Sequence, residues 1–135
     1  MNFKWPVRVY YEDTDFGGVV YYANYLKFME RARTEFLRFH GFEQDALIDK
    51  QNIIFVVRSV QCDYKSPARF NDELSVTAKI IELKKASMLF EQKIVNINHP
   101  NKILCQGQIR IACLHADSFK PCAIPNLITE VASVD

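Results

Sequence analysis

The chain contains 135 residues, of which 49% are hydrophobic, and it carries a formal net charge of +1 at pH 7. Its length fits a single domain over residues 1–135, and its apolar content suffices for a sizeable core, which excludes global disorder. The near-neutral charge argues against nucleic-acid binding, and no apolar run approaches the roughly 18 residues of a membrane helix.

The first predicted element is a strand over residues 7–12, which are rich in valine and tyrosine. The residues before it lack an apolar stretch followed by a small-residue cleavage site. We therefore expect no signal peptide and a cytoplasmic protein.

An acidic segment follows this strand, with Glu12, Asp13 and Asp15 just before the pair Gly17 and Gly18. Taken alone, such a segment forms a turn more often than a catalytic loop. A carboxylate held there nevertheless lies close to the start of the next helix, where the helix dipole favours chemistry on a polarised carbonyl.

A long amphipathic helix is predicted over residues 24–40, with Asn24 as its N-cap and Gly41 ending it. Apolar residues recur there at three- to four-residue spacing, which is typical of one buried helix face. They are Tyr25, Phe28, Met29, Ala32, Phe36 and Phe39.

Four further strands follow, each marked by apolar residues in runs or in alternating positions. We predict them over residues 53–64, 74–80, 88–96 and 103–113, with turns at 84–87 and 98–101 and one short helix near 127–131. Strands joined by short turns form successive hairpins, which predicts an antiparallel sheet with one helix against it, the α+β class. Because one helix covers only part of such a sheet, we expect pairing with a second copy through a two-fold axis.

The four cysteines are predicted to be free thiols in a reducing compartment. Cys105 and Cys113 fall in one predicted strand at a spacing of roughly 26 Å, which is too long for a disulfide. The sequence has no C-x-x-C spacing, and its three histidines are scattered. We therefore expect no metal site.

The order of strand, acidic loop, glycine pair and helix resembles hotdog-fold thioesterases of the 4-hydroxybenzoyl-CoA thioesterase-like group, including its Tol-Pal-associated acyl-CoA thioesterases. The run V-R-V-Y-Y-E-D-T-D over residues 7–15 carries much of this similarity. The other matching segments are residues 17–21, 24–26, 30–35, 55–58, 67–69 and 120–121. The likeness spans nearly the whole chain, and its specific motifs lie in the first 35 residues.

This resemblance implies the hotdog fold, an antiparallel five-stranded sheet wrapped around one long central helix. It also implies dimers whose sheets join, active sites at the subunit interface, and often tetramers. The catalytic carboxylate falls on Asp15, and the amide that polarises the thioester carbonyl falls on Tyr22. The basic turn that contacts coenzyme A falls on Lys84 and Lys85, with Ser87 close behind. The family implies no cofactor and no metal.

Two residues beside the implied catalytic centre depart from the family pattern. Many relatives have histidine where this chain has Tyr22, so a side-chain role for that histidine is absent while an amide role survives. Phe16 replaces a small residue or proline next to Asp15, where a bulky ring would reshape the acyl pocket and contact substrate.

The implied activity is hydrolysis of an acyl-CoA thioester to a free acid and a thiol, with Asp15 as nucleophile or as general base on water. The sequence leaves open whether coenzyme A or acyl carrier protein presents the acyl group. One alternative is a hotdog hydratase or dehydratase, which usually employs a histidine, yet the predicted helix has none before His40. The other is a non-catalytic partner of acyl carrier protein or of an envelope complex. No G-x-S-x-G motif supports a serine hydrolase.

Overall fold

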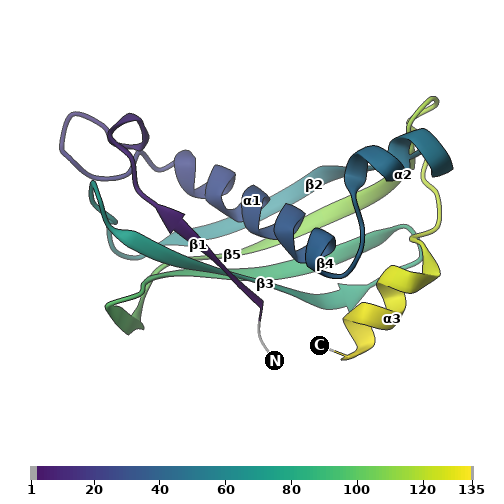
Figure 1. Cartoon of the computed structure of the whole chain (residues 1–135). Coiled ribbons are helices and arrows are strands. Elements are labelled where there is room, and N and C mark those ends of the chain that lie inside the picture. The colour runs from purple at the N-terminus through teal and green to yellow at the C-terminus, as the bar shows by residue number, and fades with distance from the viewer. Residues whose placement is uncertain (1–2, 135) are drawn as a thin grey trace.

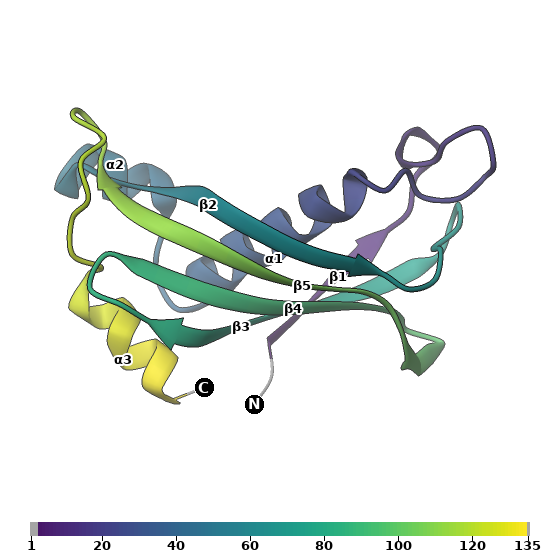
Figure 2. The ribbon, with the colours of Figure 1, turned by 180° about the vertical axis from the view of Figure 1, so that it is seen from behind.

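The structure, a computed structural model, describes residues 3–134. Five strands form one antiparallel sheet in the order β1-β3-β4-β5-β2 (Figure 1, Figure 2). They are β1 (Phe3–Arg8), β2 (Ile53–Tyr64), β3 (Glu73–Leu83), β4 (Ser87–Asn96) and β5 (His99–His115). The helices are α1 (Asn24–Phe39), α2 (Gln44–Gln51) and α3 (Asn126–Val134), with a short 3₁₀ helix, η1, over Tyr11–Asp13. The predicted α+β class and the five-stranded antiparallel sheet are confirmed.

Helix α1 lies across one face of the curved sheet and supplies the centre of the core (Figure 1). Its inner face carries Phe28, Met29, Ala32 and Phe36, each at most 1% exposed. Burial of one large apolar side chain stabilises the fold by roughly 1.5–3 kcal/mol. The apolar spacing that predicted the helix is therefore the spacing that holds it on the sheet.

The two ends of α1 differ in how well the sequence predicted them. Gly41 follows the helix with φ +92°, a conformation suited to glycine, and its N–H donates to the Arg38 carbonyl at 2.9 Å. At the other end the N-cap prediction is wrong, because the cap is Ala23 and Asn24 is the first helical residue. The Asn24 side chain instead donates from Nδ2 to the carbonyl of Asp13 at 2.8 Å, so it ties the helix to the acidic loop.

A buried glutamine fastens α1 to the sheet. Gln92 in β4 is fully buried, and its Nε2 donates to the carbonyls of Met29 at 2.9 Å and Thr77 at 3.1 Å. Its Oε1 accepts a 2.9 Å bond from the guanidinium of Arg33. Burial of this guanidinium lowers the pKa of Arg33 to about 10. Removing the glutamine would leave these buried groups unsatisfied, so it holds the helix in one position along the sheet.

The predicted first strand is placed wrongly. The structure begins β1 earlier, at Phe3–Arg8, and turns the chain into η1 where the strand was expected to continue. The N–H of Tyr10 donates to Oδ2 of Asp13 at 2.8 Å, and the N–H of Asp13 donates to the carbonyl of Tyr10 at 3.0 Å. The aspartate side chain thus competes with strand pairing for the backbone, as this residue type often does.

The prediction that all four strands after α1 follow one another as successive hairpins is also wrong. Strands β3, β4 and β5 follow one another as hairpins, but β2 pairs with β5 at one edge and β3 pairs with β1 toward the other. The connection after β2 therefore crosses the end of the sheet, where the N–H groups of Lys65 and Ser66 both donate to the Leu104 carbonyl. This arrangement curls the sheet around α1.

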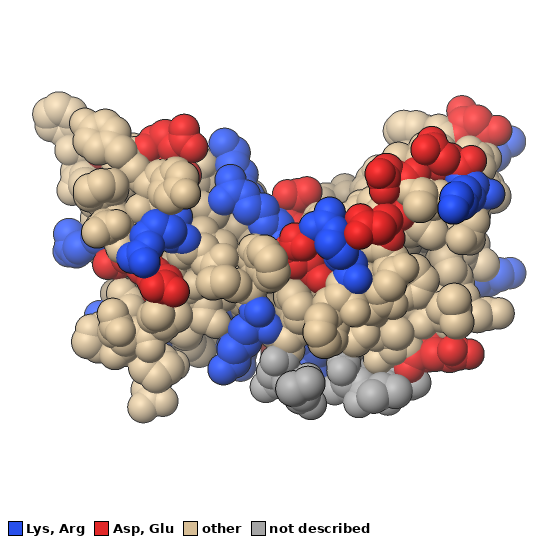
Figure 3. Space-filling view, viewed as in Figure 1, with Lys and Arg blue, Asp and Glu red and all other residues tan. Residues whose placement is uncertain are grey.

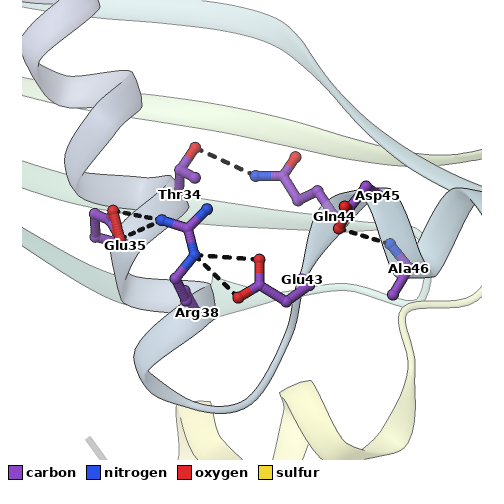
Figure 4. Close-up of polar contacts among 7 residues, drawn as sticks. All are labelled: Thr34, Glu35, Arg38, Glu43, Gln44, Asp45 and Ala46. Carbon is purple, nitrogen blue, oxygen red and sulfur yellow. Dashed lines mark hydrogen bonds and ion pairs between the residues drawn. The ribbon is translucent and has the colours of Figure 1, made fainter.

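Helix α2 was not predicted, because only Leu47 among its eight residues is buried and no apolar stripe marks it. Polar contacts connect it to α1 (Figure 4). Arg38 bonds Glu35 and also reaches Glu43 at 3.0 Å, while Gln44 donates to Thr34 at 3.3 Å. Such exposed pairs are each worth little, so they orient α2 more than they stabilise it.

The C-terminal tail folds back as a helix. Helix α3 includes the predicted short helix near residues 127–131, and its Ile128 is buried. On the face seen in Figure 3, acidic and basic side chains are interspersed. Among the described residues, no helix has the length and apolar character needed to cross a membrane.

Candidate active site

The acidic loop after η1 is closed by its own backbone. Thr14 and Val20 form an isolated antiparallel bridge, and the N–H of Asp15 donates to the Val19 carbonyl at 2.9 Å. The N–H of Gly18 donates back to the Asp15 carbonyl at 3.1 Å, and Gly18 has φ +77°. The loop therefore needs glycine at residue 18, and it presents Asp15 at a defined position.

Asp15 lies exposed at this loop, with one carboxylate oxygen held and one available. Oδ1 accepts a 2.9 Å bond from the N–H of Gly17, and among the described residues no donor reaches Oδ2. A Cβ at Gly17 would sit 3.4 Å from Oδ1, in van der Waals contact with the carboxylate. An ionised oxygen without a partner is suited to act as a nucleophile or a base.

The start of α1 offers backbone donors next to this loop. The N–H groups of Asn24, Tyr25 and Leu26 are already used in turns with the carbonyls three residues earlier. Within the described part of the chain, the amides of Tyr22 and Ala23 donate to no acceptor. Unused amides at a helix N-terminus stabilise a developing negative charge on oxygen.

Asp13 connects the loop to the helix. Its Oδ2 accepts from the N–H of Tyr10, and its carbonyl accepts from the N–H of Tyr21 at 2.9 Å and from Nδ2 of Asn24. These bonds hold the loop bearing Asp15 against the residues that begin α1.

Aromatic rings form a continuous row from the loop into the core. The ring of Tyr21 lies 4.9 Å from that of Tyr22, and Tyr22 lies 5.8 Å from Tyr64, which in turn lies 5.7 Å from Tyr25. The neighbouring Tyr22, and to a smaller extent Asp15, raise the pKa of Tyr21. Rings at these distances pack favourably and provide an apolar wall beside the free amides.

Tyr25 was expected to be core, and the structure adds a polar role for it. It is 3% exposed, and its hydroxyl accepts a 2.9 Å bond from the N–H of Ala68. The Ala68 carbonyl accepts from the N–H of Val20 at 2.8 Å, so this tyrosine also supports the acidic loop. Phe16, by contrast, projects from the loop fully exposed in the single chain.

The three residues of the predicted coenzyme A turn lie far from Asp15 in the same chain. The loop that contains Asp15 lies at the end of the sheet where β3 begins, because Val19 pairs with Arg69. The turn follows the other end of β3, where the Lys85 carbonyl accepts from the N–H of Ile124 just before α3. The length of β3 corresponds to roughly 33 Å. Lys84 is exposed with its Nζ 3.7 Å from Glu82, while Ser87 is buried and its Oγ accepts from Arg110 at 3.2 Å.

A groove of about 350 Å³ runs beside α1, between the helix and β2. No local sequence pattern marks this groove, because its walls come from segments far apart in the chain. Its lining is Leu26, Lys27, Glu30, Arg33, Val57, Val60 and Ile109. Among the described residues, no cluster of three or more histidine, cysteine, aspartate or glutamate side chains could hold a metal ion.

Several known proteins are similar to this chain in sequence and in overall structure. The thioesterase superfamily model matches residues 17–101. The acyl-CoA thioester hydrolase YbgC of Escherichia coli O6:H1 is 46% identical, with 93% of this chain and 92% of that protein covered. The YbgC acyl-CoA thioesterase of Haemophilus influenzae is 45% identical over 92% of this chain and 89% of its own length. The crystal structure of a probable thioesterase from Bartonella henselae is similar with a TM-score of 0.86 and 34% identity, covering 93% of this chain and all of that chain.

Proposed function

The chain belongs to the thioesterase superfamily, and from that premise we propose that it hydrolyses acyl-CoA thioesters with Asp15 as its catalytic carboxylate. One observation carries the proposal. A closed loop holds an exposed carboxylate with one unpartnered oxygen, and it is joined by Asp13 to a helix start where two amides are unused. The relatives named as acyl-CoA thioester hydrolases supply the substrate class.

The proposed reaction uses the amide of Tyr22 as the electrophilic group. A thioester carbonyl oxygen accepts from this N–H, and the helix dipole adds to the stabilisation of the oxyanion. Asp15 either attacks the carbonyl carbon, giving a mixed anhydride that water then opens, or removes a proton from an attacking water. Both routes expel the thiolate of coenzyme A, which takes up a proton, and both release the free acid.

The test of this function is an assay of thioester hydrolysis with short, long and aromatic acyl-CoA substrates, in which the released thiol is measured. Turnover of at least one class is expected. Rates for the same acyl groups attached to acyl carrier protein show which of the two carriers the enzyme prefers. Binding of acyl carrier protein without hydrolysis of any thioester would contradict the proposal and favour a non-catalytic partner role.

We further propose that two copies pair along β2, as a dimer that can associate into a tetramer. Strand β2 is an edge of the sheet, and its exposed residues include Val57 and Val60, at 52% and 43%. The opposite edge, β1, is six residues long and contains Pro6, which lacks an N–H for pairing. A dimer along β2 would extend the sheet and bring the exposed Asp15 loop and the groove beside α1 toward the second copy.

Analytical ultracentrifugation tests the proposed pairing through the molecular mass in solution. We expect the unmodified protein to have the mass of a dimer or tetramer at micromolar concentration, and Val60→Lys to shift it toward the monomer, because a charge replaces apolar contact. The control is Val95→Lys on β4, away from both edges. A monomeric mass for the unmodified protein would exclude pairing at the working concentration.

We propose that Lys84 and Lys85 bind the phosphates of coenzyme A in an active site completed by another copy, with Ser87 beneath them. Because both lysines lie far from Asp15 of their own chain, we infer that they bind substrate in the active site of another copy. The lysine ammonium is a mobile positive charge that suits binding of phosphate. Phe16, at the tip of the loop, would then contact the acyl group within the assembly. Acyl-CoA as substrate and four reduced thiols also support a cytoplasmic location.

For the double variant Lys84→Ala with Lys85→Ala, we expect KM for acyl-CoA to rise about tenfold while kcat changes little. The exposed pair with Glu82 contributes little to stability, so the variant should fold normally. Steady-state kinetics at low ionic strength measure the effect, and Lys79→Ala on the exposed face of β3 is the control. An unchanged KM would remove the two lysines from the substrate site.

A further inference from the structure

The four cysteines form two pairs with neighbouring sulfur atoms, although all four are free thiols. Cys62 Sγ lies 3.2 Å from Cys105 Sγ, and Cys113 Sγ lies 3.5 Å from Cys122 Sγ. A disulfide bond is about 2.05 Å long, so the first pair must close by only about 1 Å. The mechanism proposed above uses none of these thiols.

The sheet register brings Cys62 and Cys105 to one face. In the β2–β5 ladder Cys62 lies opposite Gly107, and Cys105 lies opposite Tyr64. A Cβ at Gly107 would meet the Gln61 carbonyl at 3.2 Å and Cys62 Sγ at 3.5 Å. Because Gly107 has no side chain, the Cys62 side chain has the space to point diagonally across the ladder toward Cys105.

This pair adjoins the aromatic row of the candidate active site. Tyr64 lies opposite Cys105, and its ring contacts both Tyr22 and Tyr25. Burial, and after it the neighbouring Cys62, raises the pKa of Tyr64 to about 12. A change in the position of Cys62 would therefore be transmitted to the ring that packs on Tyr22.

We propose that Cys62 and Cys105 are an oxidisable dithiol, which a hydroperoxide converts to a disulfide that slows hydrolysis in the adjoining site. The formation of the disulfide is independent of the proposed function, whereas the slowing of hydrolysis rests on it. The second pair, Cys113 and Cys122, lies at the other end of β5, where the chain leads into α3, and provides an internal comparison.

The chemistry begins at Cys62, which is partly exposed, while Cys105 is buried and burial raises the pKa of its thiol. The Cys62 sulfur attacks one peroxide oxygen, the O–O bond breaks, and a sulfenic acid and one water or alcohol result. The Cys105 sulfur then attacks the Cys62 sulfur, the S–O bond breaks, and the leaving oxygen takes the thiol proton as water. The two thiols lose two electrons in total, and the peroxide gains them.

Diagonal neighbours in an antiparallel ladder lie about 7–8 Å apart, whereas a disulfide holds its Cα atoms within about 6.8 Å, so closing this bond shifts the β2 backbone next to Tyr64. The Tyr64 ring moves with the strand, so its packing on Tyr22 changes beside the amide proposed to hold the oxyanion. Misplacement of a reacting group by about 1 Å costs up to about 100-fold in rate. We therefore expect kcat/KM to fall about 10- to 100-fold on oxidation and to recover with dithiothreitol.

Peptide mapping tests the bond itself. The full-length protein is treated with hydrogen peroxide, its remaining thiols are alkylated in acid, and its peptides are separated without reduction. We expect a peptide pair joined through Cys62 and Cys105 that is two hydrogen atoms lighter than its parts. The matched controls are two variants: this joined peptide pair should be absent from Cys62→Ser and present in Cys113→Ser. A Cys62 that oxidises only to sulfinic acid, or that bonds another chain, would overturn the assignment.

Kinetics on the same samples test the consequence. The unmodified protein and Cys113→Ser should lose activity with peroxide, whereas Cys105→Ala should keep the activity that it has before treatment. A complete Cys62–Cys105 bond with unchanged hydrolysis would overturn the coupling to the site. If the reduced protein hydrolyses no thioester, the proposed function fails while the peptide map still decides whether the dithiol exists.

Discussion

Asp15→Asn is expected to lower kcat for thioester hydrolysis by about 100- to 10,000-fold, the range for loss of a catalytic base or nucleophile. The asparagine Oδ1 can still accept the bond from the Gly17 N–H, so the loop keeps its conformation while the charge is lost. Steady-state kinetics with the preferred acyl-CoA measure the effect. Thermal unfolding should stay close to that of the unmodified protein, because Asp15 is exposed.

The matched control is Glu12→Gln, which removes one negative charge from an exposed residue of the same acidic segment. We expect this variant to keep nearly full activity. Asp13 is unsuitable as a control because its carboxylate holds the loop through Tyr10. Near-normal turnover by Asp15→Asn, or an equal loss in Glu12→Gln, would show that Asp15 is not the catalytic carboxylate.

Tyr22→Pro is expected to lower kcat by about 100- to 1,000-fold, because proline has no N–H to stabilise the oxyanion. Proline is tolerated just before or at the first turn of a helix, and the Tyr22 amide donates to no acceptor among the described residues. The substitution therefore removes the donor without breaking a hydrogen bond of the fold, and it also removes the ring that contacts Tyr21 and Tyr64. Kinetics and circular dichroism together separate lost chemistry from lost structure.

Tyr22→Phe is the companion variant, because it keeps the amide and most of the ring while removing the hydroxyl. We expect it to retain kcat within about tenfold, with any change appearing as altered preference among acyl groups. If Tyr22→Phe loses as much activity as Tyr22→Pro, the side chain and not the amide carries the role. If a folded Tyr22→Pro keeps its activity, the oxyanion is held elsewhere.

Local patterns predicted the parts of this fold that depend on near neighbours in sequence. The apolar spacing from Tyr25 to Phe36 predicted α1, because a helix presents every third or fourth residue to the core. Gly41 ended the helix as expected, since its positive φ suits glycine. The prediction of the first strand was wrong because the carboxylate of Asp13 accepts a hydrogen bond from the N–H of Tyr10, which turns the chain.

Predictions that depended on distant pairing were less successful. Alternation marked β2 and β3 as strands but could not show that β2 pairs with β5, because alternation is the same whichever partner a strand has. The same limit applies to the cysteines. Spacing within one strand separates Cys105 from Cys113, but only the register between strands reveals Cys62 beside Cys105.

The sequence by itself determined the class of the fold, the position of α1 and the acidic loop with Asp15, because these follow from periodicity, turn residues and a specific motif. Only the tertiary structure decided which oxygen of Asp15 is free, which amides before α1 are unused, and that Lys84 lies at the end of β3 opposite to the acidic loop. These features depend on how strands far apart in sequence align. Such alignment is set by the packing of the sheet around α1, and a linear pattern of residues does not encode it locally.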